Sequence, residues 1–195
     1  MPLTLKQATA PASEPVTLAE AKLHLRVDFD DDDTLIAAQI ASAREVVEAI
    51  ARRALITQTW DLVLDAFPGV YYIDLPLPPL QSVTSVKYVD EDGNEHTFSS
   101  TYYIVDTYRE PGRLVLASNA SWPSNTLQET AGVRVRFVAG YGDDGDDVPA
   151  KFKQAILLLI GHYYEHRESV SDERSLAILP QGVRELLWMD RNYSF

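Results

Sequence analysis

The stretch TLIAAQIASAREVVEAIARRALITQTWDLVLD, residues 34–65, contains the change of hydrophobic period that decides the fold. In its first part the apolar positions are spaced alternately by four and three residues, which predicts one continuous apolar seam along a helix. From Gln58 the period becomes two, because Trp60, Leu62 and Leu64 share one face of an extended segment. A helix over 34–55 is therefore followed by a β-strand. The seam residues expected to pack against other helices or subunits include Ile36, Ile40, Val47 and Ile50.

Three further helices are expected outside this stretch. Thr17 and Glu20 form a capping box, which predicts a helix over 18–27. Pro149 suits the first turn of a helix over 149–167, and a last short helix is expected near 182–190. The packing positions predicted on the helix after Pro149 are Phe152, Ile156 and Leu159.

Short alternating segments between residues 58 and 139 are separated by Pro, Gly and Asn, which is typical of antiparallel strands. The predicted class is therefore α+β: a small α-helical bundle (16–57 plus 140–179) with an inserted antiparallel β unit (58–139). Residues 1–15 are expected to form a flexible leader unless a neighbour holds them, and 180–195 a C-terminal docking arm.

The net negative charge argues against a protein that binds nucleic acid through its phosphate groups. The chain has 195 residues, with 17 basic and 29 acidic side chains and a formal net charge of −12. It has no cysteine, which excludes disulfides and thiolate sites, and no apolar run long enough to span a membrane. Acidic side chains concentrate in two clusters, Asp30, Asp31, Asp32 and Asp33 in one and Asp143, Asp144, Asp146 and Asp147 in the other.

Three motifs suggest ligands and each has a simpler interpretation. Gly140–Gly145 has dinucleotide-loop spacing, but its aspartates would repel a pyrophosphate. Asp28, Asp30 and Asp32 suggest a calcium loop, but Asp33 stands where the loop needs glycine. His162–His166 reads H-x-x-E-H and would need a third zinc ligand, for which Glu168, Glu173 and Glu185 are the nearby candidates. The alternative is that both histidines lie at the C-terminal end of a core helix, where imidazole complements the negative end of the helix dipole. No metal or cofactor is expected from these motifs.

The order of several phrases resembles the head-tail connector (adaptor) proteins of long-tailed bacteriophages, prophages and gene transfer agents. These phrases are PVTLAEAK at 15–22, LITQTW at 55–60, LP at 75–76 with PLQSV at 79–83, VAGYG at 138–142, VP at 148–149 with KQAI at 153–156, and GVRELL at 182–187. The resemblance implies a structural virion protein and not an enzyme. It implies a homo-oligomeric ring, commonly twelvefold, under the portal protein in the virion neck, made from subunits present in the host cytoplasm before assembly.

The same resemblance implies partners and surfaces. Genomic DNA would pass through the ring without sequence-specific binding, and a downstream neck or tail (stopper) protein would attach below it. Acidic side chains of the two clusters would line the channel, because like charge lets the duplex slide. The residues expected to dock on the portal are Val183, Leu186, Leu187, Trp188, Tyr193 and Phe195. The alternatives left open are a zinc-dependent hydrolase built on His162–His166 and a generic protein- or glycan-binding module.

Overall fold

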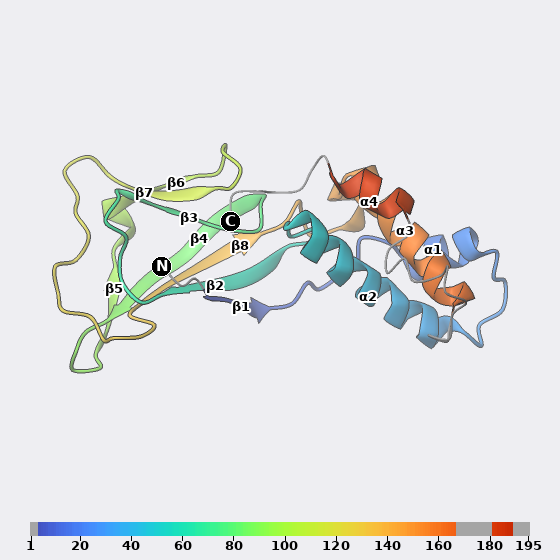
Figure 1. The fold of residues 1–195 in the computed structure, drawn as a ribbon, viewed down its shortest axis with the longest axis horizontal. Helices are drawn as coiled ribbons and strands as arrows, with labels where there is room; N and C mark the ends of the chain where they lie inside the picture. Colours follow the sequence, from blue (N-terminus) through green and yellow to red (C-terminus); the bar gives the residue numbers. More distant parts are fainter. Residues whose placement is uncertain (1–3, 167–180, 189–195) are drawn as a thin grey trace. The chain divides into compact units, whose positions relative to one another are not determined.

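The computed structural model describes residues 4–166 and 181–188, which divide into two compact units (Figure 1). A β unit takes in residues 4–11 and 57–141, and a helical unit takes in 12–56, 142–166 and 181–188. Both units thus combine segments that are distant in sequence, because the chain leaves the helical unit after α2 and returns to it before α3. Among the described residues, no helix combines the length and apolarity that crossing a bilayer requires.

The helical unit contains α1 (Leu18–Leu25), α2 (Asp33–Ala51), the 3-10 turn η2 (Gly145–Asp147), α3 (Ala150–Glu165) and α4 (Gln181–Trp188). The predicted capping box is present at the start of α1, where Thr17 and Glu20 exchange hydrogen bonds. Helix α2 ends four residues before the predicted boundary because Arg52 adopts a left-handed conformation with φ 53°. Its seam faces α1, α3 and α4.

The predicted packing residues lie as follows. Ile36, Ile40, Val47, Phe152, Ile156 and Leu159 are buried, and Ile50 is half-buried. The start of α2 lies beside the end of α3, where the Tyr164 hydroxyl donates to Asp32 Oδ2 at 2.6 Å. Burial of the apolar packing residues stabilises the contacts among the four helices by about 1.5–3 kcal/mol per large side chain.

The β unit contains two antiparallel sheets (Figure 1). The larger has the order β1-β2-β8-β4-β5, formed by β1 (Thr4–Thr9), β2 (Gln58–Leu64), β8 (Val133–Ala139), β4 (Leu80–Val89) and β5 (Glu95–Phe98). The smaller has the order β3-β7-β6, formed by β3 (Tyr72–Asp74), β7 (Arg113–Leu116) and β6 (Tyr103–Asp106), which follows the 3-10 turn η1 (Ser100–Tyr102). The predicted α+β class, with helices and an antiparallel β insertion, is confirmed.

Two strands were not predicted from the sequence. Residues 4–9, expected to form a loose leader, pair with β2 as the edge strand β1. Strand β5 pairs with β4 in a hairpin, and Gly93 adopts the positive φ of 84° that the turn between them needs.

Candidate functional site

The Asp30–Asp33 cluster is partly neutralised within the helical unit. Lys22 Nζ lies 2.7 Å from Asp30 Oδ1 and 2.7 Å from Asp33 Oδ1. These hydrogen bonds raise the pKa of Lys22, and the bond from Lys22 lowers the pKa of Asp30. The lysine ammonium stands among the carboxylates that suggested a calcium loop, so a side chain of the protein supplies the positive charge there.

The Asp143–Asp147 cluster lies at the other end of α3. All four aspartates are exposed, and Asp146 Oδ1 is 3.7 Å from Lys153 Nζ. The Asp147 carboxylate lies where a Cβ added at Gly142 would stand, and Asp147 Oδ2 accepts from the Asp144 N–H at 3.3 Å. The glycine-rich loop therefore holds a carboxylate in the place where a dinucleotide loop would hold phosphate.

The two acidic clusters form separate surfaces. One contacts α3 at Lys153 and the other at Tyr164, which are about 16 Å apart along the helix axis at 1.5 Å per residue. A single side chain or ion cannot contact both clusters. Each must be assigned its own role.

The His162 and His166 side chains are two candidate ligands for a metal ion. The His162 and His166 rings are edge to face with centroids 4.8 Å apart. Within residues 4–166 and 181–188 there is no group of three His, Cys, Asp or Glu side chains that could hold a metal ion. Glu185 lies exposed on α4, whereas Glu168 and Glu173 lie outside the described residues. The hydrolase alternative therefore has an incomplete ligand set in this part of the chain.

The predicted portal-docking residues on α4 differ in burial. Val183 and Leu187 are fully buried in the helical unit, where α4 packs on α3 and α2. Leu186 is half-buried, and Trp188 is 53% exposed with the Arg184 guanidinium 5.9 Å from its ring centroid. Tyr193 and Phe195 lie outside the described residues. Val183 and Leu187 thus pack inside the subunit, and among the described positions of α4 Trp188 is the large apolar side chain with the most solvent exposure.

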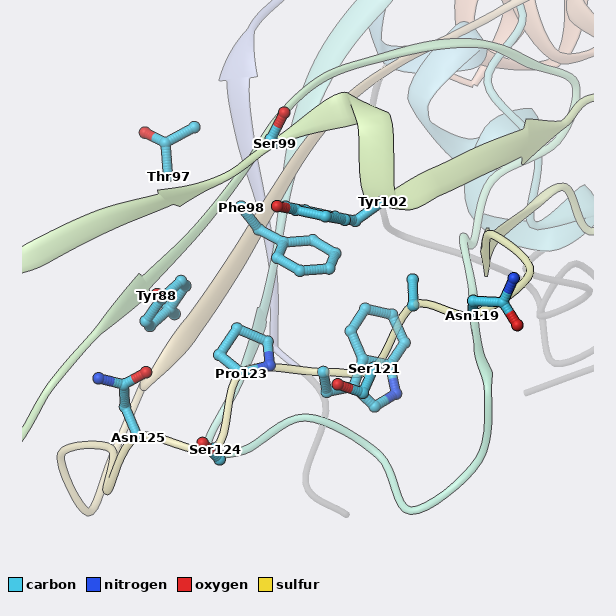
Figure 2. Close-up of a pocket in the computed structure, with 12 residues that line it drawn as sticks. Tyr88, Thr97, Phe98, Ser99, Tyr102, Asn119, Ser121, Pro123, Ser124 and Asn125 are labelled. Atoms are coloured by element: carbon cyan, nitrogen blue, oxygen red, sulfur yellow. The ribbon is translucent and has the colours of Figure 1, made fainter.

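A pocket of about 440 Å³ opens in the β unit, where the loop carrying Ser121, Pro123 and Asn125 passes opposite Tyr88, Phe98 and Tyr102 (Figure 2). Its wall is held by Trp122, which stacks on Phe67 at 5.0 Å. The lining combines four aromatic rings with neutral hydroxyl and amide groups. It consists of Tyr88, Thr97, Phe98, Ser99, Tyr102, Asn119, Ala120, Ser121, Trp122, Pro123, Ser124 and Asn125.

The sequence reasoning did not find this pocket, because its walls come from three separate segments that only tertiary folding brings together. The cluster Ser121-Trp122-Pro123 was the one local signal, and it reads equally well as an ordinary loop. A small ligand or a peptide would fit this pocket.

Comparison with known proteins gives a family. The family model described as "Phage gp6-like head-tail connector protein" matches residues 15–109 and 123–191, and so takes in both units. None of the curated proteins matches the chain. The loop between the two matched ranges contains Asn119 and Trp122 of the pocket wall.

Solved structures agree with the family. The neck of an empty GTA particle computed with C6 symmetry contains a chain 25% identical to this one, with a TM-score of 0.81, covering 98% of this chain and 97% of that chain. The virion of a native gene transfer agent (GTA) particle contains one that is 25% identical, with a TM-score of 0.80 and 98% and 96% covered. A third similar chain, from the neck of a native GTA particle computed with C12 symmetry, is 24% identical with a TM-score of 0.79 and supports the fold. With most of its length matched, the chain belongs to the phage gp6-like head-tail connector family.

Proposed function

We propose that this protein forms a ring beneath the portal, extends the DNA channel there, and provides the attachment platform for the next neck protein. The observation that carries the proposal is the family match across both units. The similarity to a chain in a particle neck computed with C6 symmetry supports it, since sixfold symmetry is compatible with a twelvefold ring. We infer the same position for this chain, in the neck of a phage, prophage or gene transfer agent virion.

We assign channel lining to Asp143, Asp144, Asp146 and Asp147. They are exposed, whereas in the other cluster Asp32 and Asp33 are half-buried and bonded to Tyr164 and Lys22. A surface of exposed carboxylates repels DNA phosphates, so the duplex is guided without being held.

We assign portal docking to the exposed side of α4, with Trp188 as its anchor and Leu186 beside it. A large aromatic side chain that is half exposed in the free subunit and next to an arginine is the type of residue that dominates binding energy at interfaces. Tyr193 and Phe195 remain candidates for the same contact.

The test uses single substitutions in α4, because deletion from Pro180 would also remove the buried Val183 and Leu187. Trp188→Ala should leave the subunit folded and reduce its incorporation into portal-containing heads by at least about tenfold, the effect of losing one interface anchor. Gly182→Ala on the same helix is the control, because a Cβ there meets only Leu158 at 3.8 Å. Wild-type incorporation of folded Trp188→Ala would contradict the docking assignment.

We further infer that the protein acts through contact and shape, with no bond made or broken. Exhaustive dialysis followed by metal analysis tests this inference against the hydrolase alternative. Stoichiometric zinc that persists in the wild type and is lost in His162→Ala would contradict it.

A further inference from the structure

The outer face of the five-stranded sheet carries more positive than negative charge. In the register of the sheet, Lys6 is opposite Asp61, Asp61 is opposite Arg136, and Arg134 is opposite Lys87. The alternate residues, such as Leu62, Val135 and Phe137, point to the core. We call this surface the basic face. Its charged members are the cations Lys6, Lys87, Arg134 and Arg136 and the carboxylates Asp61 and Glu95.

The carboxylates do not balance the cations. Arg136 donates two hydrogen bonds to Asp61, at 2.7 and 2.8 Å, yet 44% of its side chain is exposed. Arg134 is 46% exposed and 3.9 Å from Glu95, which also pairs with Lys87. This accessible sheet face therefore keeps an excess of positive charge on a protein whose net charge is −12.

The helical unit carries a complementary surface where α1 turns into α2. Leu23 is 81%, Phe29 47% and Leu35 37% exposed there. Asp28, Asp30 and Asp31 are exposed in the same turn, and with Asp32 and Asp33 they outnumber the exposed Arg26 and the Lys22 that bonds to Asp30 and Asp33. We call this surface, residues 23–35, the acidic corner. It combines apolar side chains, which supply binding energy, with carboxylates, which supply orientation.

Resting on the ring proposed above, we propose that the basic face of one subunit binds the acidic corner of the next copy in the ring. A head-to-tail ring needs two different, mutually complementary surfaces on every subunit. The basic face and the acidic corner provide such a pair by charge, and Val63 and Val138, half-buried on the basic face, provide apolar surface for Phe29.

Charge reversal within one chain tests this contact. Arg134→Glu and Asp31→Arg should each lower the number of subunits per purified particle by at least about tenfold, because each places like charges together across the interface. The double variant R134E/D31R should return to within about threefold of the wild type, because the opposite charges then face each other again with the signs exchanged.

The control is Arg109→Glu in the same β unit, since the Arg109 side chain is also 46% exposed but lies outside the basic face. It should incorporate normally. Circular dichroism of each purified variant establishes that the substitutions leave the subunit folded.

The outcomes separate this contact from the proposed function. The contact would be overturned if both single variants were incorporated at the wild-type level, or if the double variant failed to recover. Either result would leave the proposed ring itself untouched. The contact would also be overturned if the wild type bound duplex DNA and Arg134→Glu lost that binding while being incorporated normally, because the basic face would then contact DNA. Absence of the wild-type protein from particle necks would overturn the proposed function itself.

Discussion

Arg44 shows how a charge is kept inside the helical unit. Its side chain is 7% exposed; Nε donates to Glu14 at 2.8 Å and Nη1 to Glu48 at 2.9 Å. Burial alone would lower the pKa of Arg44, but the hydrogen bond to Glu14 and the charge of Glu48 raise it overall. Glu48 also accepts from the Leu55 N–H at 2.8 Å, so one arginine fixes both the entry to the unit and the end of α2.

Arg44→Ala should therefore destabilise the helical unit by about 3 kcal/mol, the cost of leaving partly buried carboxylates without their cation. Urea unfolding followed by far-UV circular dichroism measures the effect. Glu45→Ala is the matched control, because Glu45 is 72% exposed and 3.8 Å from Arg44, and its loss should change the free energy of unfolding by less than about 0.5 kcal/mol. Equal effects of the two substitutions would contradict the proposed role of Arg44.

Asp90 makes the β4–β5 hairpin sensitive to acid. Its Oδ2 is 2.7 Å from His96 Nε2, and its Oδ1 accepts from the Asn94 N–H at 2.9 Å. The bond with His96, followed by the bonds with Asn94, lowers the pKa of Asp90 from 3.8 to about 2. A lowered carboxyl pKa stabilises the folded state above pH 3.8, and this contribution is lost as the pH falls from 3.8 to about 2.

An NMR titration of the Asp90 carboxyl carbon should accordingly show a midpoint near 2. In His96→Ala the midpoint should move up toward the ordinary aspartate value, since the largest cause of the shift is gone. A wild-type midpoint at the ordinary value would show that the pair does not form in solution.

At the scale of the element, the sequence predicted what local periodicity determines. The seam from Ile36 to Val47 and the alternation from Trp60 to Leu64 each follow from one segment, and both elements are present, although α2 ends before its predicted boundary. Strand β1 lacks such a pattern because most of its side chains are exposed, and its pairing with β2 depends on residues fifty or more positions away. The same reason hid the Arg44–Glu14 pair.

The entry to β8 depends on a glycine for space. A Cβ added at Gly132 would lie 2.5 Å from the Asp65 carbonyl oxygen and 3.2 Å from that of Gln128. Backbone atoms cannot move aside as a side chain does, so Gly132→Ala should destabilise the β unit by about 1–3 kcal/mol.

Thermal unfolding followed by tryptophan fluorescence measures this loss, since Trp60 and Trp122 both lie in the β unit. Gly69→Ala is the matched control, because nothing lies within 4 Å of a Cβ added there, and its melting temperature should match the wild type. Equal melting temperatures of Gly132→Ala and Gly69→Ala would show that the backbone around Gly132 shifts to accept the added Cβ without a cost in stability.

At the scale of the whole molecule, charge and resemblance predicted different parts of the function. The net charge of −12 argued against a protein that grips nucleic acid, and the ordered phrases predicted the connector family, which the family match confirms. Burial of Val183 and Leu187 could not be read from α4 alone, because eight residues of amphipathic helix do not show which face the rest of the subunit covers.

The isolated protein should be a monomer or a weak oligomer at micromolar concentration in physiological salt. Each copy carries a net charge of −12, so copies repel one another in solution. In the proposed assembly, the portal would overcome this by holding neighbouring copies at a high effective concentration, which turns each later contact into an almost intramolecular one. Light scattering of the purified chain, alone and with portal rings, should show large assemblies only in the mixture. A stable ring formed without portal would mean that contacts between subunits outweigh the repulsion unaided, and that assembly needs no template.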